Sequence, residues 1–531
     1  SCLTVGTDLA ATMKFLSVIS LCFLLCLCVH SVSSQNANTP PRGWNSYDSF
    51  SWIITEEEYL QNAQIISDQL LSQYGYEYAV VDYLWYRNLN GDSNSRGNDL
   101  IDEWGRMHPD PERWPSSRGW NGFKNVADKV HGMGLKFGIH LMAGISTQAY
   151  DADTLILDTS TGKAYEECGK VQHVKDIAIP DRACKWMSNG FMALNVTSGA
   201  GKAFLRSIYE LYISWGVDFV KLDCVFGEDL DFEEITYVSQ ILKDHKPSIV
   251  FSLSPGVSAT PNMAKTINGL VNMYRVTGDD WDQWSQVVTH FDVARDYAAA
   301  KLTGAQGLNG YSWPDLDMLP FGWLTDPAAK EGPHRSTNLN LVEQQTQMTL
   351  WCMAKSPIMY GGDLRNLDSW TKDGVITNPT LLFINSNSTD NTEACEPFLL
   401  FFGRILYIQL IIQGNKIFTA NTTLNNVKIK GRIMDNVQAE GSSNGIRAWI
   451  ATGHNGGQTP EGQDIYIAFF NLNDVATTIY AKVDDLARAL PGKKLRGLEG
   501  REVWSLNNVL LNDVLSAEVA AHGCALFVFD Y

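Results

Sequence analysis

Aspartates recur at or just beyond the ends of short apolar segments, where they could do chemistry. The residues are Asp82, Asp223, Asp279, Asp315 and Asp317. If the apolar segments are parallel strands of a barrel, their carboxyl ends share one face and these side chains converge there. A ring of carboxylates has three interpretations: a divalent-metal site, a structural ion-pair network, or the carboxyl pair of a glycoside hydrolase.

Two basic residues accompany these aspartates. Lys221 lies two residues before Asp223, so the strand period puts both side chains on one face, and Arg275 lies four residues before Asp279. Glycoside hydrolysis needs one carboxylate that stays ionised, which a neighbouring ammonium favours, and one carboxyl that keeps a proton. The pattern favours a glycosidase. Metal-dependent chemistry and purely structural roles stay open, although few His or Glu residues stand at these positions.

A repeating helix–strand pattern from residue 40 to about 385 must position these side chains. In its first unit Thr55 and Glu58 form a capping box, apolar residues follow at helical spacing, and Gly75 precedes the next apolar segment. The same order returns along the chain. Strands are expected at 42–46, 78–85, 136–142, 217–223, 249–254, 273–278, 307–313 and 356–362.

Near-continuous apolar strands that alternate with helices predict a parallel sheet covered on both faces. We expect an α/β fold, a (β/α)8 TIM barrel over residues 40–387, with a doubly wound open sheet as the alternative. Beyond residue 388 the strands follow one another without helices, which predicts an antiparallel β-sandwich over 388–531. Its expected strands are 405–412, 426–434, 464–472, 477–483 and 524–530.

The N-terminal region predicts entry into the secretory pathway. Met13 and Lys14 precede an apolar run over 15–29, and small residues around Ser34 suit a cleavage site. We therefore expect a signal peptide at 13–34 preceded by an upstream translated segment at 1–12, with a membrane anchor as the alternative. The destination would be the extracellular space or cell wall, or a lysosome or vacuole.

The net charge and the cysteine spacing limit which binding partners and metal ions are expected. The chain has 531 residues and a formal net charge of −18 without a basic stripe, so nucleic acid and anionic membrane surfaces are not expected partners. Outside the signal no cysteine pair has CxxC spacing, which argues against zinc. In an oxidising compartment Cys168 and Cys184 are candidates for a local disulfide. Glycosylation sequons stand at Asn195, Asn387 and Asn421.

Several segments resemble glycoside hydrolase family 27, the α-galactosidase and α-N-acetylgalactosaminidase family. The resemblance runs from Pro41 through the expected β-sandwich, and the segments stand in the family's order. They are PRGWNSYDSF (41–50), VDYLW (81–85), KFGIHLMAG (136–144), WGVDFVKLDC (215–224), YRVTGDDWDQW (274–284), WPDLDML (313–319) and AKSPIMYGGDLR (354–365).

The resemblance implies a mechanism and a set of sugar-binding residues. Asp223 would be the nucleophile and Asp279 the acid/base of a retaining double displacement, with the two carboxyls about 5–5.5 Å apart. The substrate would be the terminal sugar of an oligosaccharide, polysaccharide or glycoconjugate, and no cofactor or metal is implied. The implied sugar-binding and pocket residues are Asp82, Lys221, Arg275, Asp317, Trp44, Tyr47, Tyr83 and His140.

Departures from the family pattern point to altered specificity. Tyr83 replaces the second of two adjacent aspartates that hold the 4- and 6-hydroxyls of galactose, and a hydrogen bond to a charged group is worth about 1.5–3 kcal/mol. β-L-arabinopyranose is α-galactose without its hydroxymethyl arm. The hypothesis is that β-L-arabinopyranosides are accepted at least as well as α-galactosides.

Other departures leave alternatives open. Tyr47 and His140 replace the family's Trp and Tyr, and Pro255-Gly256 replaces the Glu-Trp that reads the 2-hydroxyl. The cysteine that would pair with Cys224 aligns with Gln148, and an insertion covers roughly 145–200. The alternatives are an α-N-acetylgalactosaminidase or other exo-glycosidase of the family, a metal-dependent hydrolase of the same fold, and a non-catalytic sugar-binding homologue.

Overall fold

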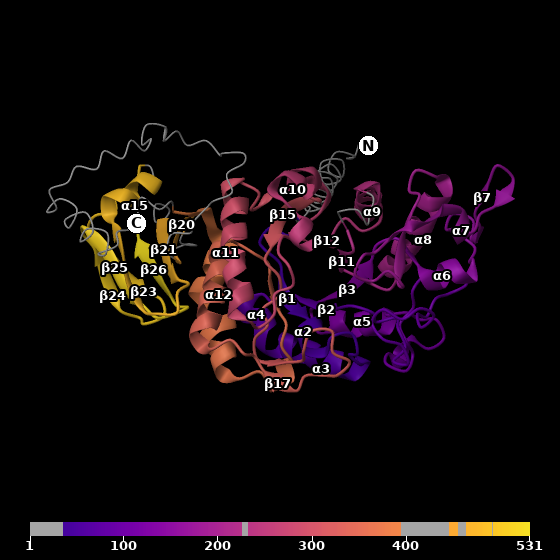
Figure 1. The fold of residues 1–531 in the computed structure, drawn as a ribbon, viewed down its shortest axis with the longest axis horizontal. Coiled ribbons are helices and arrows are strands. Elements are labelled where there is room, and N and C mark those ends of the chain that lie inside the picture. The colour runs from indigo at the N-terminus through magenta and orange to yellow at the C-terminus, as the bar shows by residue number, and fades with distance from the viewer. Residues whose placement is uncertain (1–34, 226–231, 395–444, 455–462, 491) are drawn as a thin grey trace, which may run out of the picture.

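The computed structural model describes residues 35–225, 232–394, 445–454, 463–490 and 492–531. This part of the chain forms an N-terminal body of strands and helices and a C-terminal body of strands (Figure 1). Within these ranges no helix is both long enough and apolar enough to cross a membrane.

A curled, mostly parallel sheet organises the N-terminal body. Its strand order is β14-β15-β13-β12-β11-β3-β2-β1-β18, and every neighbouring pair is parallel except β14 with β15. The parallel strands are β1 (Arg42–Asn45), β2 (Tyr78–Val81), β3 (Lys136–Met142), β11 (Phe219–Asp223), β12 (Val250–Ser254), β13 (Met273–Arg275), β15 (Gly310–Asp315) and β18 (Ile358–Tyr360).

The two ends of this sheet approach each other. Leu319, just after β15, forms a parallel bridge with Tyr360 of β18. Its N–H donates to Met359 at 2.8 Å and its carbonyl accepts from Gly361 at 3.0 Å. The sheet therefore curls back toward its first strands, and strand residues such as Val80 and Val250 pack together as a separate apolar cluster.

Each parallel strand is followed by helix, and most of the buried apolar side chains lie between the two layers. The short α2 (Tyr47–Phe50) directly follows β1. The expected capping box at Thr55 and Glu58 is confirmed. The larger helices are α3 (Glu56–Ile66), α5 (Lys124–Gly132), α8 (Gly199–Ser214), α9 (Phe232–His245), α10 (Pro261–Ile267), α11 (Trp284–Ala299), α12 (Leu341–Met353) and α13 (Pro379–Asn387).

The expected parallel strands are present, mostly with tighter bounds, and one expectation needs correction. Residues 307–313 do not form a single strand, because β14 (Ala305–Gly307) and β15 are two arms of a hairpin. Gly307 pairs with Gly310, and Asn309 in the turn has a φ of 52°. Asparagine tolerates this left-handed conformation better than most residues, which allows so short a turn.

The insertion after β3 forms its own small structure. Its three-stranded antiparallel sheet has the order β4 (Ile145–Ser146), β10 (Phe191–Leu194), β9 (Ala178–Ala183). Two short ladders and two short helices complete it and lie at the end of the molecule opposite the C-terminal body (Figure 1). They are β5 (Leu157–Asp158) with β6 (Lys163–Ala164), β7 (Glu166–Glu167) with β8 (Lys170–Val171), α6 (Thr147–Ala152) and α7 (Val174–Ile177).

The C-terminal body is an antiparallel β-sandwich. A six-stranded sheet faces a two-stranded sheet over an apolar core that includes Ile467, Leu515 and Phe527. The first sheet runs β19 (Ser388–Glu393), β20 (Ile446–His454), β21 (Gln463–Asn471), β26 (Cys524–Asp530), β23 (Leu498–Glu502), β24 (Asn508–Leu511), and the second pairs β22 (Thr477–Lys482) with β25 (Val514–Val519). A helix, α15 (Val483–Ala489), follows β22.

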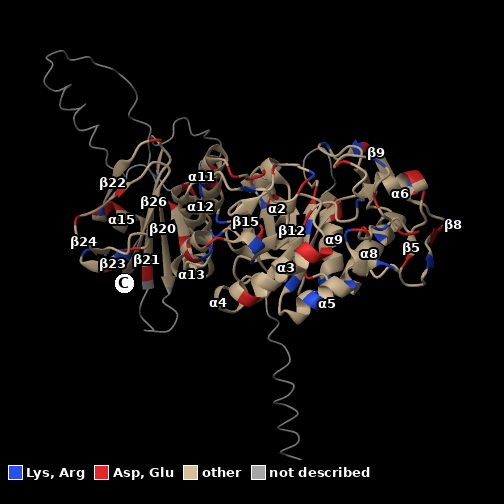
Figure 2. Ribbon diagram, turned by 90° about the horizontal axis from the view of Figure 1, so that it is seen from below, with Lys and Arg blue, Asp and Glu red and all other residues tan. Residues whose placement is uncertain are grey.

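The expected strands at 464–472, 477–483 and 524–530 are confirmed as β21, β22 and β26. Those at 405–412 and 426–434 lie outside the described residues. The sandwich packs beside α11 and α12 (Figure 1), where Phe291 meets Phe470 edge to face and Arg447 pairs with Asp292. Acidic and basic positions are interspersed over both bodies (Figure 2).

The capping box generates the first prediction. Thr55→Ala removes the hydroxyl that accepts the Glu58 N–H, so we expect the free energy of unfolding to fall by about 1 kcal/mol. Thr55→Ser keeps the acceptor oxygen and is expected to stay within about 0.5 kcal/mol of the wild type. Urea titration followed by tryptophan fluorescence measures both values. Equal losses in the two variants would contradict a capping role.

Candidate active site

The carboxyl ends of the parallel strands surround a cavity of about 510 Å3. Asp223 is the last residue of β11, Asp82 directly follows β2, and Asp317 follows β15. All the catalytic and sugar-binding residues expected from the sequence except Trp44 line this cavity. They are Tyr47, Asp82, Tyr83, His140, Lys221, Asp223, Arg275, Asp279 and Asp317. Asp315, expected to converge with the other aspartates, is buried outside the lining.

The expectation that Trp44 lines the pocket is wrong. Its side chain is fully buried, its indole N–H donates to the Gly362 carbonyl at 2.8 Å, and its ring packs against Phe50 and Tyr59. Successive side chains of a strand point to opposite faces, and in β1 the face that carries Trp44 meets the helix layer. Trp44 therefore supports the sheet and does not contact the cavity.

A buried ion pair forms one part of the cavity floor. Lys221 Nζ donates to Asp82 Oδ2 at 3.1 Å, and Asn45 donates to the same oxygen at 2.6 Å. Burial raises the pKa of Asp82, but Lys221 and His140 outweigh it and hold the pKa below its usual range. Burial likewise lowers the pKa of Lys221, and the nearby aspartates raise it above its usual range. Both groups are therefore charged at neutral pH.

Asp223 is oriented by two hydrogen-bonding neighbours. His140 Nε2 lies 3.1 Å from Asp223 Oδ2, and the Cys224 backbone N–H donates to Oδ1 at 2.5 Å. His140 is buried on β3, the strand directly beside β11. Lys221, the residue expected to assist Asp223, donates to Asp82 instead. The carboxyl of Asp223 is thus held in place at the strand end while part of it faces the cavity.

Arg275 joins two carboxylates across the other part of the floor. Its guanidinium lies 2.9 Å from Asp317 Oδ1 and 3.0 Å from Asp279 Oδ1. Asp317 is buried, whereas the side chain of Asp279 is 71% exposed. Desolvation raises the pKa of Asp279, but the charge and hydrogen bond of Arg275 lower it by more. The pKa of this carboxyl is therefore below its usual value. In the free protein Asp279 is therefore an ionised group at the mouth.

The neighbours of Asp279 are engaged elsewhere. Asp280 is buried and accepts from Gln347 at 2.5 Å, and Asp282 pairs with Arg335. In the sequence, the four-residue spacing from Arg275 selects Asp279 among these three aspartates. The structure agrees, because Asp279 is the one of the three that Arg275 contacts in the described residues.

Sequence reasoning missed several residues of the cavity wall. Asp48 of α2 lines it, and its buried Oδ2 has no hydrogen-bond partner among the described residues. Burial, followed by the charge of Asp317, raises the pKa of Asp48 well above its usual range. Trp281 packs against Tyr47, and Trp186 comes from the insertion. Only the position of Asp48 beside Tyr47 in the sequence could have indicated its place.

The disulfide differs from the expected one. Cys184 is bonded to Cys224, with their Cα atoms 5.9 Å apart, and Cys168 is a free, exposed cysteine between β7 and β8. The candidate pair of Cys168 and Cys184 is therefore wrong. The insertion folds back over the end of β11 and brings Cys184 to the residue after Asp223, while Cys168 stays on an outlying hairpin. Cys184 takes the place that the family resemblance aligns with Gln148.

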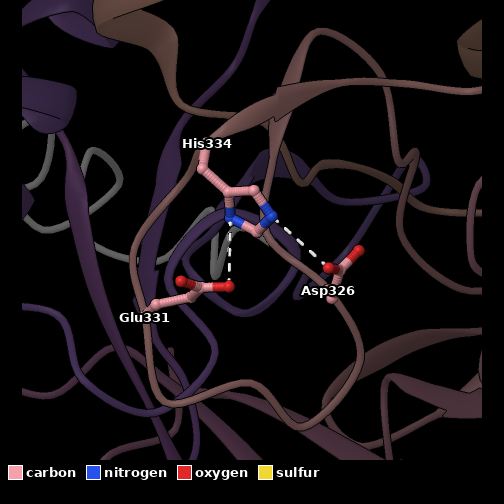
Figure 3. Close-up of side chains that lie close together, drawn as sticks. All are labelled: Asp326, Glu331 and His334. Atoms are coloured by element: carbon pink, nitrogen blue, oxygen red, sulfur yellow. Dashed lines mark ion pairs between the residues drawn. The ribbon is translucent and has the colours of Figure 1, made fainter.

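The two described sequons and the candidate metal cluster lie outside the cavity lining. Asn195 and Asn387 are exposed, Asn421 is outside the described residues, and glycosylation stays a prediction. Within the described ranges, one cluster has ligand-like spacing, namely Asp326, Glu331 and His334 in the loop between β16 (Trp323–Leu324) and β17 (Arg335–Ser336) (Figure 3). All three are exposed, and Arg335 already donates to Asp326 at 2.6 Å, so the cluster reads as an ion-pair network.

Comparison with known proteins matches both bodies. A family model described as alpha galactosidase A covers residues 43–178 and 203–387. The chain belongs to glycoside hydrolase family 27. A second model, the alpha galactosidase C-terminal beta sandwich domain, covers residues 443–529 of this family 27 chain. The protein is accordingly an enzyme, a glycosidase of the α-galactosidase type.

Relatives of this family 27 enzyme carry more than one activity name. The α-galactosidase of Oryza sativa subsp. japonica is 23% identical over 92% of this chain and 84% of its own. The β-L-arabinopyranosidase of Geobacillus stearothermophilus is 28% identical, with a TM-score of 0.73 over 93% and 96% of the two chains. A candidate α-N-acetylgalactosaminidase of Bacillus halodurans is 27% identical, with a TM-score of 0.69 over 94% and 98%.

The buried carboxyl of Asp315 gives the stability of the protein a predictable dependence on pH. Its buried carboxylate accepts the backbone N–H of Asp317 at 2.9 Å, and burial, followed by the charge of Asp317, raises its pKa to about 6. In the unfolded chain the group ionises near pH 4. Between about pH 4 and 6 the unfolded state loses a proton that the folded state keeps, so this contribution to stability falls as the pH rises.

Asp315→Asn removes the titration while keeping an acceptor oxygen. Relative to the wild type, its free energy of unfolding is expected to rise by up to about 3 kcal/mol between pH 4 and pH 7. Urea unfolding at the two pH values measures the change, and the comparison between them cancels any pH-independent packing loss. A difference between variant and wild type that is the same at both pH values would exclude the raised pKa.

Proposed function

We propose that this family 27 enzyme is a secreted, retaining exo-glycosidase that accepts terminal β-L-arabinopyranosyl residues at least as well as the stereochemically equivalent α-D-galactosyl residues. The observation that carries the proposal is Tyr83, whose ring lines the cavity beside His140 where the family pattern has an aspartate. The cavity, near 500 Å3, has the size of a small-molecule site.

In the first step Asp223 attacks the anomeric carbon. The glycosidic C–O bond breaks, the leaving oxygen takes a proton from Asp279, and a covalent glycosyl ester remains on Asp223. In the second step water attacks the same carbon, Asp279 takes its proton, and the ester bond breaks. The two inversions together retain the configuration of the sugar.

The acid role of Asp279 depends on the substrate. Arg275 keeps Asp279 ionised in the free enzyme, and an acid needs a proton. A bound sugar covers the exposed carboxyl, removes water from it and brings hydroxyls to Arg275. Both changes favour the neutral form of Asp279, because desolvation penalises the charge and the hydroxyls compete for the guanidinium.

Tyr83 offers no carboxylate to a hydroxymethyl arm. Its hydroxyl points to the Ser93 carbonyl and the Met187 sulfur, both at 3.4 Å, and its ring contacts Tyr47 and His140 edge to face. A galactoside would place its 6-hydroxyl against this aromatic wall and forgo a hydrogen bond to a carboxylate. An arabinopyranoside has no such hydroxyl to satisfy. The Geobacillus relative named a β-L-arabinopyranosidase supports this preference.

The architecture and the disulfide support two further parts of the proposal. The parallel strands with their helices, together with the bridge between Leu319 and Tyr360, support a closed (β/α)8 barrel. The bond between Cys184 and Cys224 supports secretory entry, because disulfides persist in oxidising compartments.

A second candidate is α-N-acetylgalactosaminidase activity. Pro255 and Gly256 line the cavity where the family has the Glu-Trp that reads the 2-hydroxyl, and an N-acetyl group needs room at that position. The Bacillus halodurans relative is named as a candidate α-N-acetylgalactosaminidase. An aryl α-N-acetylgalactosaminide therefore belongs in the substrate set.

The catalytic assignment predicts the effect of removing the nucleophile. Asp223→Asn keeps the size of the side chain but cannot form the ester, so kcat on aryl β-L-arabinopyranoside is expected to fall at least about a thousandfold. Asp326→Asn, the same substitution at an exposed aspartate outside the cavity, is the matched control and should keep full activity. For the wild type, proton NMR of the sugar first released should show the same anomeric configuration as the substrate. Release of the inverted anomer would refute double displacement.

Tyr83 predicts a switch in sugar preference. Tyr83→Asp restores a carboxylate, so the ratio of kcat/KM for galactoside over arabinopyranoside is expected to rise about 10- to 100-fold. Tyr83→Phe keeps the aromatic wall and should leave this ratio within about twofold of the wild type. The proposed specificity is contradicted if the wild type prefers the galactoside and Tyr83→Asp leaves the ratio unchanged.

A further inference from the structure

The cavity changes in character from floor to mouth. The floor consists of buried charged groups, among them Asp82, Arg275 and Asp317. Such fixed, desolvated groups suit the hydroxyls of the terminal sugar. At the mouth, the side chain of Asp279 is 71% exposed and Trp186 is 50% exposed. The acid/base thus faces outward, toward the side where the leaving group must be.

Trp186 is held rigidly although half of its surface is exposed. The backbone N–H of Met187 donates to the Cys184 carbonyl at 3.2 Å, which closes a turn around Trp186. Met187 on one side of it is fully buried, and Cys184 on the other side is bonded to Cys224, the residue after Asp223. The turn is therefore fixed at both ends, and one of its ends is covalently tied to the nucleophile strand.

Two rings, Tyr83 and His140, link the indole of Trp186 to Asp223. Tyr83 contacts His140 with a centroid distance of 5.7 Å and contacts Trp186 at the same distance, and His140 contacts Asp223. Trp186 therefore extends the aromatic wall of the cavity outward from the nucleophile. The separation of Trp186 from Asp223 by two rings suits contact with the group attached to the terminal sugar better than contact with the terminal sugar itself.

The segment that carries Trp186 lies outside the family-model match. Residues 179–202 lie between the two stretches that the family model matches. This part of the wall therefore comes from the insertion after β3, which contributes Lys185 and Trp186 to the cavity lining.

We propose that Trp186 is the platform of a leaving-group subsite that binds a ring with an apolar face, either a second sugar or an aryl group. The inference rests on the proposed glycosidase function and adds its leaving-group specificity. A rigid indole offers a large, flat apolar surface at little cost in conformational entropy, and sugar C–H faces and aryl rings both pack on such a surface. The ring would leave after Asp279 protonates the oxygen that links it to the terminal sugar.

The test compares leaving groups at a constant terminal sugar, taken as the sugar that the wild type prefers. The substrates are the glycosyl fluoride, the 4-nitrophenyl glycoside and a disaccharide. Fluoride is too small to reach Trp186. In Trp186→Ala we expect kcat/KM to fall about 10- to 50-fold on the disaccharide, the aryl glycoside or both, and to stay within about twofold on the fluoride.

Two variants control this measurement. Trp186→Phe keeps an aromatic platform and should recover most of the loss. Trp120→Ala removes a tryptophan that is 58% exposed and lies outside the cavity lining, so it should leave all three substrates unchanged. Loss on the disaccharide alone identifies a sugar leaving group, and loss on the aryl glycoside alone identifies an aryl group.

Other outcomes overturn the subsite. An equal loss on all three substrates in Trp186→Ala would show that Trp186 acts on the terminal sugar or on the fold, and no loss on any would show that it binds nothing. A wild type that turns over none of the three refutes the proposed glycosidase function and the subsite with it. If the wild type turns over these substrates and Trp186→Ala changes kcat/KM equally on all three, or on none, the subsite is refuted and the glycosidase function stands.

Discussion

The pairing of two cations, the buried Arg275 and the largely buried Lys221, with several buried carboxylates is the constraint on which the site depends. Lys221 and Arg275 stand within a floor that contains Asp82 and Asp317, with Asp48 in the adjoining wall. Carboxylates left alone at this density and burial could not all be ionised. Lys221 keeps Asp82 charged, Arg275 bridges Asp317 and Asp279, and the excess appears as raised pKa values at Asp48 and Asp315.

The fold makes this arrangement possible by bringing strand ends together. Parallel neighbours place their last residues at one face, so groups far apart in sequence meet without long loops. Two positions show the strain of this convergence, because Asp317 has a φ of 90° and Cys224 a φ of 57°. Non-glycine residues rarely adopt such values, and the surrounding hydrogen bonds and the disulfide must hold them there. Strain of this kind concentrates at functional sites.

Prediction from the sequence succeeds where the signal is local. Apolar runs between glycines and helical repeats locate the parallel strands, and the capping box of Thr55 is correct in detail. It fails where a turn interrupts a run, as at Asn309, where one expected strand is a hairpin. In the sandwich, β19, β20 and β23–β25 went unpredicted. The partly exposed β19 and β23–β25 have a weaker apolar signal than buried strands. The buried β20 has an apolar run that Arg447, Thr452 and Gly453 interrupt.

The sequence by itself determined which chemistry is available: aspartates at or just beyond several strand ends, Lys221 on the face of Asp223, and Arg275 four residues before Asp279. These depend on spacings within one element, which the backbone period enforces. Only the tertiary structure decided that Trp44 faces the helices, that Cys224 pairs with Cys184, and that Trp186 reaches the cavity. The orientation of a strand and the path of an insertion depend on packing between segments distant in sequence, and no local spacing encodes them.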